Sequence, residues 1–202
     1  MRYVASGCEG TDKNMVIVES CRKSAETLRK LYPEAEILNV TSRGDEPWVR
    51  FSPFYPHGDI PVPLSPGVTA SCVEGIWQAL KVFETADVDP AKLSVTTMTG
   101  LKRTTRRLGR VLGHRTGLGG DRLLPYLDAR RAIYLPAYRW VLENRLADEV
   151  ARLKQLATTK DVVLLDYETN GDVNDLSRPL SHASLVAAYV RGEWPGCHEA
   201  AT

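Results

Sequence analysis

The segment from residue 41 to residue 67 constrains the fold most strongly, because it is too rich in proline to form a long helix or a central strand. It reads TSRGDEPWVRFSPFYPHGDIPVPLSPG and contains six prolines and four aromatic residues. A loop of this length within a compact domain is usually functional or disordered, and aromatic side chains that need burial disfavour disorder. We therefore expect an irregular but ordered loop, which either packs against the core or forms one wall of a ligand site.

The rest of the chain is typical of one soluble α+β domain. Its 202 residues are 43% hydrophobic and 25% charged, a usual balance for a globular domain that needs neither disulfide nor metal for stability. Periodic sequence begins at Met15. We expect a disordered arm over residues 1–14, one mainly helical domain with a small sheet over 15–192, and a tail over 193–202. With no run of about 18 apolar residues and no secretory signal, a cytoplasmic protein without membrane contact is expected.

Apolar periodicity and capping signals place the regular elements around the proline-rich loop. Strands are expected at 15–18, 36–40 and 161–167, and whether the first two pair with each other is open. Helices are expected at 20–32, 71–84, 121–133, 136–156 and 181–190.

The segment from 100 to 115 is strongly basic. It reads GLKRTTRRLGRVLGHR and contains six Lys and Arg residues without an acid. Its leucines predict a helix from which several arginines project together. Such a surface is a solvated face, a phosphate-binding patch for a small nucleotide, or a nucleic-acid surface. The whole chain has 26 basic and 25 acidic residues, a balance that argues against nucleic acid.

Cysteine spacing gives no sign of a metal or cofactor site. The four cysteines lie at positions 8, 21, 72 and 197, with no CxxC pair and no Cys/His cluster of metal-ligand spacing. Neither a Gly-rich phosphate loop nor a local Ser/His/Asp pattern is present. We expect no metal and no cofactor, and we interpret Cys72 as a packing residue.

The predicted helix 71–84 has one polar face. At about 100° per residue, Glu74, Gln78 and Lys81 lie close together, opposite an apolar stripe. One interpretation is structural, because Ser71-x-x-Glu74 matches a capping box in which the glutamate bonds back to the start of the helix. The other is that Glu74 is a catalytic carboxylate beside a ligand, with the aromatic loop nearby.

Four acids cluster around the end of the last predicted strand, at Asp166, Glu168, Asp172 and Asp175. Acids next to an Asn-Gly pair are often turn formers, because their side chains bond their own backbone. Alternatively, one of them meets Glu74 across a cleft and shares acid, base or charge-stabilising work with it.

Two stretches resemble the NADAR superfamily of YbiA-like N-glycosidases. FSPFYP at 51–56 is similar to that family's FSNFYP-like loop, and SCVEGIWQALK at 71–81 is similar to its S-V-E-H-x-x-Q-x-x-K helix. RRLGR at 106–110 resembles a basic LGR segment of the family. The likeness covers about residues 36 to 190, with Pro53 and Gly75 in place of an Asn and a His. The chain is therefore identified as a divergent branch with a YbiA-like fold.

The resemblance implies hydrolysis of the C1′–N bond of a phosphorylated, nucleotide-like ribosyl substrate. ADP-ribosyl compounds and ribosylaminopyrimidine phosphates are of this type, either free or attached to a macromolecule. Glu74 is implied as the essential carboxylate, because bond cleavage builds positive charge on the ribose. Asp172 or Asp175 stands in for the aspartate of the family's D-x-x-W-G element. The implied substrate-binding residues are Phe51, Tyr55, Trp77, Gln78, Lys81, Arg106, Arg107 and Arg110.

Two other functions stay open. In the first, the chain is a catalytically silent module that binds a nucleotide or ADP-ribose. The lack of an evident D-x-x-W-G element favours this alternative. A weaker alternative is RNA or DNA binding by the arginine-rich segment, for which affinity falls steeply with salt.

Overall fold

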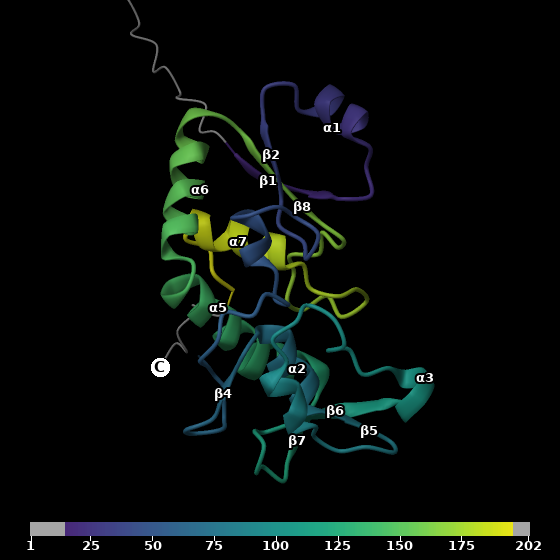
Figure 1. The fold of residues 1–202 in the computed structure, drawn as a ribbon. Helices are drawn as coiled ribbons and strands as arrows, with labels where there is room; N and C mark the ends of the chain where they lie inside the picture. The colour runs from purple at the N-terminus through teal and green to yellow at the C-terminus, as the bar shows by residue number, and fades with distance from the viewer. Residues whose placement is uncertain (1–14, 196–202) are drawn as a thin grey trace, which may run out of the picture.

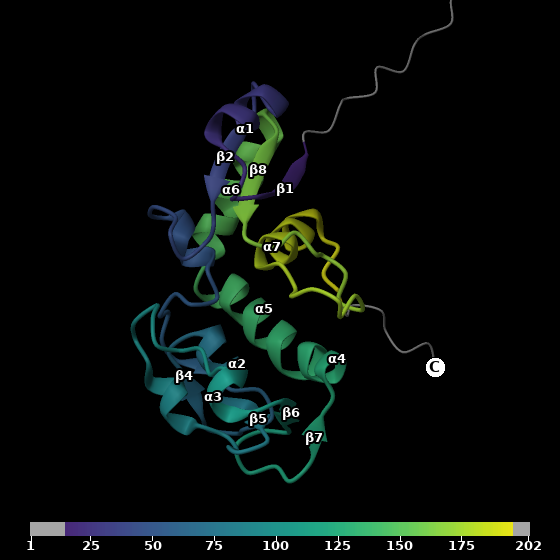
Figure 2. The same cartoon turned by 90° about the vertical axis from the view of Figure 1, so that its right-hand side faces the viewer.

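The computed structural model describes residues 15–195, and its central strand is β8 (Val162–Asp166). β8 pairs in parallel with β1 (Val16–Ser20) on one side and β2 (Glu36–Asn39) on the other. All five β8 residues are buried, as expected for the middle of a covered parallel sheet. The three predicted strands are confirmed. β1 and β2, in the upper part of Figure 1, do not pair with each other, because β8 lies between them, as Figure 2 shows.

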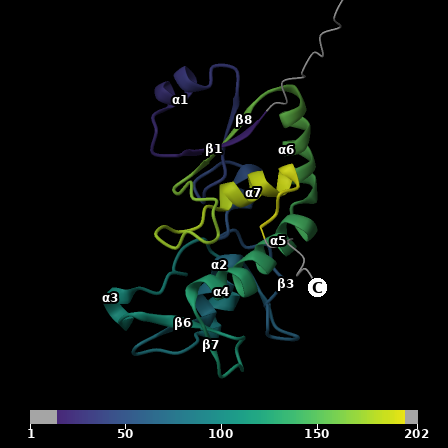
Figure 3. The ribbon, with the colours of Figure 1, turned by 180° about the vertical axis from the view of Figure 1, so that it is seen from behind.

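Helices cover both faces of this sheet. Val163 and Leu165 pack with Leu28 of α1 (Ala25–Leu31). Val162 and Leu164 belong to the larger core, together with residues of α6 (Ala147–Thr159) and α7 (His182–Arg191). This alternation follows from the two-residue period of side chains along a strand. Figure 3 shows α6 and α7 from behind.

The proline-rich loop is ordered and largely structural. It forms a short 3₁₀ turn at Trp48–Phe51 (η1), and its strand β3 (Ile60–Pro61) pairs with β4 (Thr69–Ala70). The Phe51 side chain is fully buried, and the Tyr138 hydroxyl donates to the Phe51 carbonyl at 2.6 Å. The loop therefore packs against the core, and at Pro53 and Phe54 it also lines a pocket. The two expected arrangements occur together.

The helix expected over 71–84 is shorter than predicted. Helix α2 covers Val73–Leu80, and strand β5 (Lys81–Phe83) follows directly. β5 pairs antiparallel with β6 (Val111–Arg115), which pairs in turn with β7 (Leu123–Leu124). Val82 and Phe83 suit a strand at least as well as a helix, and pairing with a distant segment decides between the two.

The prediction of a helix across the basic segment is wrong for most of that segment. Only α3 (Thr105–Leu108) is helical there, and β6 takes the residues beyond it. Gly109 follows α3 with a φ of 80°, a conformation that ends a helix and favours glycine. Arg106 and Arg107 lie on α3, Arg110 lies in the link that follows it, and Arg115 ends β6. These arginines therefore do not share one helical face as predicted.

The region between β7 and α6 is one bent helical stretch. It comprises α4 (Tyr126–Ala129), a π-helical turn at Arg130–Tyr134 (η3) and α5 (Leu135–Asn144). Pro136 lacks the N–H that a regular helix needs, and the wide π turn just before it accommodates this loss. The predicted helix 121–133 thus begins later. The predicted helix 136–156 is broken before α6.

One hydrophobic core joins these parts. It contains Val16 and Leu164 of the parallel sheet, Trp77 of α2 and Leu142 of α5. Figure 2 shows α5 passing from the parallel-sheet half to the half that holds α2 and β5-β6-β7. The expected α+β class, mainly helical with little sheet, is confirmed. Among the helices of residues 15–195, none combines the length and the apolar character needed to cross a lipid bilayer. The arm predicted over 1–14 lies outside the described residues.

Candidate functional site

Two adjoining pockets lie where β8 and the loop after β2 meet α2. We call the first, of about 380 Å³, the Glu74 pocket, and the second, of about 400 Å³, the Thr41 pocket. Parallel sheets commonly bind ligands beyond the carboxyl ends of their strands, and Asp166 is the last residue of β8. The pockets share four lining residues, which are Phe54, Lys102, Asp166 and His182.

Glu74 faces the pocket from the first turn of α2 and does not cap its own helix. The N-cap is Cys72, whose Sγ accepts from the Gly75 N–H at 3.2 Å. The capping-box interpretation is therefore wrong. The backbone N–H of Glu74 instead donates to the Pro53 carbonyl at 2.8 Å, which ties the start of α2 to the proline-rich loop. Glu74 is 8% exposed, so its carboxyl group is nearly desolvated.

Gln78 fixes the Glu74 carboxyl group. Its Nε2 donates to Glu74 Oε1 at 2.8 Å, and its Oε1 accepts the backbone N–H of Arg103 at 3.0 Å. A backbone N–H can only donate, so the amide orientation of Gln78 is determined. Burial raises the pKa of Glu74, against the opposing effects of the Gln78 hydrogen bond and the charges of Lys81 and Lys102.

Two lysines supply cationic groups that are available for a ligand. Lys81 and Lys102 both line the Glu74 pocket. Within residues 15–195, neither amine has a hydrogen-bond acceptor from the protein, and each lies over an aromatic ring, Trp77 at 5.8 Å and Phe54 at 5.7 Å respectively. Burial lowers the pKa of Lys81, although the Glu74 charge acts in the opposite direction. Both ammonium groups are free to bind an anion.

Two arginines line the same pocket but serve the fold. Arg103 donates to the carbonyls of Gln78, Lys81 and Asp87 at 3.2, 2.5 and 2.7 Å. Arg130 is 2% exposed and donates to three carbonyls between residues 173 and 178, at 2.7 to 2.9 Å. Each guanidinium group thus makes three hydrogen bonds to backbone carbonyls, although the buried Nε of Arg130 has no partner among the described residues. Both groups add positive charge to the pocket.

An aromatic wall completes the Glu74 pocket. Trp77 packs edge-on against Tyr126 and Tyr134, with centroid distances of 5.7 Å in both pairs. The ring of His114 lies 3.8 Å from Trp77, and neither of its buried nitrogens has a hydrogen-bond partner within the described chain. Burial and the charge of Lys81 lower the pKa of His114 to about 3. His114 is therefore neutral and supports Trp77 from behind.

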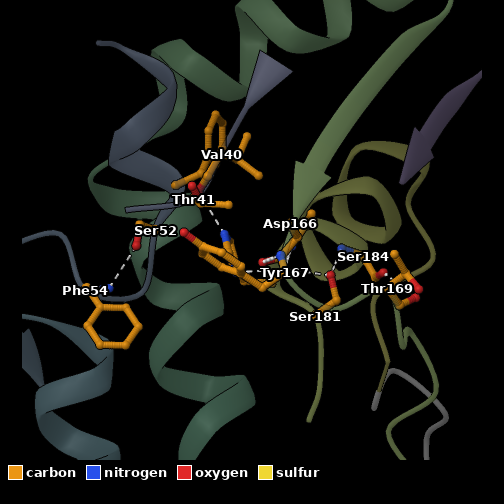
Figure 4. A network of polar contacts seen from close by, with 12 residues as sticks. Val40, Thr41, Ser52, Phe54, Asp166, Tyr167, Thr169, Ser181 and Ser184 are labelled. Atoms are coloured by element: carbon orange, nitrogen blue, oxygen red, sulfur yellow. Dashed lines mark hydrogen bonds and ion pairs between the residues drawn. The ribbon is translucent and has the colours of Figure 1, made fainter. Parts of the chain in front are cut away.

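Asp166, labelled in Figure 4, forms a buried ion pair with His182. Both residues line both pockets. His182 Nδ1 lies 3.0 Å from Asp166 Oδ2, and His182 Nε2 lies 2.8 Å from the Val40 carbonyl oxygen. Burial opposes ionisation of both groups. Their mutual attraction and hydrogen bonds prevail, and they lower the pKa of Asp166 to about 2 and raise that of His182.

Most predicted substrate-binding residues outside α2 lie away from the pocket. Phe51 is in the core, and the Tyr55 hydroxyl donates to Glu46 at 3.2 Å. Arg110 lies 3.3 Å from Glu84. Arg106 and Arg107 are exposed on α3, and Arg107 lines a separate surface hollow with Asp87 and Asp89. The structure brings together Glu74, Trp77, Gln78 and Lys81 from the predicted set.

Asp172 and Asp175 are not brought to Glu74. Asp172 Oδ1 accepts from the Asn174 N–H at 2.8 Å, and Asp172 lines a different cavity, near Arg131 and Trp194. Asp175 Oδ1 accepts from the N–H and the hydroxyl of Ser177 at 3.0 and 2.5 Å. Both act as turn formers. The acids of this region that line the Glu74 pocket are Asp166 and Glu168.

A protein-family model matches most of the chain. A model of DUF6939, described as a family of unknown function, matches residues 20–186. The chain belongs to DUF6939. The match includes every residue that lines the Glu74 and Thr41 pockets, so the candidate site lies within the DUF6939 region. No curated protein matches the chain.

Several pocket residues of this DUF6939 protein escape sequence reasoning. Arg130, Tyr126 and Tyr134 come from a helical segment whose pattern indicates only an amphipathic helix. His182 follows the cap residue of α7, and its position next to Ser181 gives no sign that it meets Asp166. Asp166 did carry a signal, because an acid that ends a buried strand is placed at the edge where parallel strands bind ligands.

Proposed function

We propose that this protein is an N-glycosidase that hydrolyses the C1′–N bond of a phosphorylated ribosyl substrate, and that DUF6939 is a divergent branch related to the NADAR superfamily. The observation that carries the proposal is the Glu74 carboxyl group, buried and held by Gln78 at 2.8 Å in a pocket with cationic and aromatic walls. Buried carboxyl groups in a cleft are a common mark of acid–base sites.

The two lysines favour an anionic substrate. Lys81 and Lys102 line the pocket without an acceptor from the described protein, and ammonium groups bind phosphate as point charges. Arg103 and Arg130 add positive charge nearby. A phosphate on the ribose, held by the lysines, would leave the sugar ring beside Glu74.

The aromatic wall favours a planar leaving group. Trp77 is clamped between the His114 ring and two tyrosines, so its indole is rigid and 8% exposed. A nucleobase or a nicotinamide-like ring would pack against this aromatic cluster at Tyr126, which lines the pocket and is 39% exposed. The pocket volume of about 380 Å³ falls within the usual range for small-molecule sites.

The test is a search for released base. The purified protein is incubated with ribonucleoside 5′-phosphates, nicotinamide mononucleotide and NAD, and free base and ribosyl phosphate are measured by mass spectrometry. We expect at least one of these compounds to be hydrolysed. Calorimetry with ADP-ribose and ribose 5-phosphate runs in parallel. Binding of either without hydrolysis of any compound would favour a silent nucleotide-binding module instead.

The lysines provide a second check on the same site. Lys81→Ala and Lys102→Ala should each weaken binding of ribose 5-phosphate by about tenfold, the loss of roughly one charge-assisted contact. Lys30→Ala, on the distant helix α1, is the matched control. Unchanged affinity in both pocket variants would contradict the phosphate site. The proposed compartment is the cytoplasm, where nucleotide-like substrates are made and consumed.

A further inference from the structure

Asp166 supplies a second carboxyl group to the Glu74 pocket, and its hydrogen bonds determine its protonation state. It ends β8, is 4% exposed and lines both pockets. Its Oδ2 accepts from the Ser181 hydroxyl at 2.8 Å, from His182 Nδ1 at 3.0 Å and from the Ala183 N–H at 3.3 Å. Its Oδ1 accepts from the Tyr167 N–H at 2.7 Å (Figure 4). Every one of these partners donates, and Asp166 needs no proton of its own.

The contacts of His182 require a cationic ring. Nδ1 faces the Asp166 carboxylate and Nε2 faces the Val40 carbonyl, and both of these groups accept. A neutral imidazole carries one N–H, so it would leave one nitrogen lone pair against an acceptor oxygen. With both nitrogens protonated, each contact is a hydrogen bond. A buried histidinium therefore lies against Asp166 and stabilises its negative charge.

Glu74 stands in a different environment. Its one side-chain donor in the described protein is the neutral amide of Gln78, and burial favours its protonated form. Burial, followed by the charges of Glu74 and Asp166, raises the pKa of Tyr134, so both carboxyl groups lie near the same phenol. Tyr134 also lines the pocket. Two carboxyl groups with opposite preferences for a proton thus border one space.

We propose that Asp166 is the second catalytic carboxylate of this site, that it stabilises positive charge on the ribosyl ring, and that His182 is the positioning residue that keeps it ionised. This inference rests on the proposed N-glycosidase activity. Glu74 then acts as the general acid and the general base. When the leaving group is a nucleobase, the electron pair of the C1′–N bond leaves with the base, which takes the proton of Glu74. A water oxygen bonds to C1′, and the proton it releases returns to Glu74.

A purely structural role for Asp166 is the alternative. Its Oδ2 also accepts the Ala183 N–H in the first turn of α7, and a carboxylate is stabilising at a helix N-terminus. In such a role Asp166 stabilises the folded protein and makes no contribution to ligand binding. The test must therefore measure a property of the pocket that a helix cap would not change.

The test compares two ligands of equal shape and different charge. One is an iminoribitol 5-phosphate, whose ring nitrogen is protonated and mimics the charge developed in bond cleavage, and the other is ribose 5-phosphate. In the wild-type protein we expect the cationic ligand to bind at least about tenfold more tightly, since sites bind transition-state mimics better than ground-state ligands. Asp166→Asn should reduce this preference to within about twofold, because the fixed charge is gone.

Two variants serve as comparisons. Glu74→Gln should keep the preference within about threefold, because Glu74 is the carboxyl group that holds a proton. Asp172→Asn makes the same chemical change outside the pocket, where Asp172 only forms its own turn, and should match the wild type. If a thermal melt shows that Asp166→Asn does not fold, the double variant Asp166→Asn/His182→Gln is used instead. It replaces the ion pair with two neutral amides.

The outcomes separate the two claims. A preference that survives in the Asp166 variant, or that disappears in Glu74→Gln, overturns the assignment of Asp166, and so does a wild type without preference. Failure of both ligands to bind the wild type overturns the assignment and the proposed function together. A preference that depends on Asp166, in a protein that releases no base from any nucleotide, counts against the proposed function alone.

Discussion

The side-chain amide of Gln78 joins the Glu74 carboxyl group to the backbone of Arg103. It donates to Glu74 Oε1 at 2.8 Å and accepts the Arg103 N–H at 3.0 Å. Arg103 is itself held by three carbonyls, two of them from residues 78 and 81. The loop that carries Lys102 is thereby fixed against the carboxyl end of α2, and the acid and the lysines of the pocket are held in one rigid arrangement.

Gln78→Ala should destabilise the fold. It removes the partner of a backbone N–H and of a buried carboxyl oxygen, and buried polar groups without a partner cost about 1–3 kcal/mol each. Urea unfolding measures the change. Gln155→Ala, on an exposed face of α6, is the control and should stay within about 0.5 kcal/mol of the wild type. Equal effects in the two variants would contradict the bridging role of Gln78.

The Asp166–His182 pair predicts a window of maximal stability. The pKa of Asp166 is lowered from 3.8 to about 2, so its contribution is complete above 3.8 and is lost as the pH falls towards 2. The pKa of His182 is raised above 6.5, so its contribution is complete below 6.5 and is lost as the pH rises through the higher, folded value. The other groups that face His182 are the Val40 carbonyl and the ring of Tyr138, with Lys102 on the same pockets.

Urea midpoints at pH 3, 5 and 9 check this window. We expect the wild type to be most stable at pH 5 relative to His182→Gln, and the difference between the two proteins to shrink at both extremes. His182→Ala leaves the buried Asp166 charge without its cation and should cost about 3–5 kcal/mol. A difference that is constant across the three pH values would show that the pair is not ionised.

Arg130 should fix the loop that borders the Glu74 pocket. Its guanidinium donates to the carbonyls of residues 173, 175 and 178, and a lysine cannot reproduce this fork. Arg130→Lys is expected to destabilise the protein by about 2 kcal/mol or more and to speed hydrogen exchange across 172–180. Arg122→Lys, at an exposed position, should change neither quantity. Slow exchange retained in Arg130→Lys would contradict this anchoring.

His114→Phe should leave stability unchanged or raise it by about 1 kcal/mol. The buried His114 ring has two nitrogens without a partner, and an apolar ring of similar shape removes that cost. Because the pKa of His114 is about 3, the fluorescence of Trp77 should also be constant between pH 5 and 8. A strongly destabilised variant would show that a water or a ligand group bonds to this ring.

The sequence predicts elements whose signal is local. β8 contains a continuous apolar run, and Ser181 is the N-cap of α7, where its hydroxyl accepts the Ser184 N–H at 3.1 Å. The predicted proximity of Glu74, Gln78 and Lys81 also holds, because these residues line one pocket. It holds although Lys81 belongs to β5 and not to the helix.

The other features depend on contacts between distant segments. α2 ends at Leu80 because β5 pairs with β6, about 30 residues further along the chain. Arg103 and Arg130 bond to backbone carbonyls, which carry no signature in the amino-acid sequence. For the same reason the arginines expected in the site, at 106, 107 and 110, could not be told apart from Arg103 by composition or spacing.

The rate of base release by Glu74→Gln tests the central claim most directly. The substitution keeps the shape of the side chain and removes its acid–base function, and Glu84→Gln, on the surface beside Arg110, is the matched control. With the nucleotide that the wild type hydrolyses fastest, measured by mass spectrometry of the free base, we predict a loss of about 100-fold or more in Glu74→Gln and none in Glu84→Gln. Equal rates in wild type and Glu74→Gln would contradict the account.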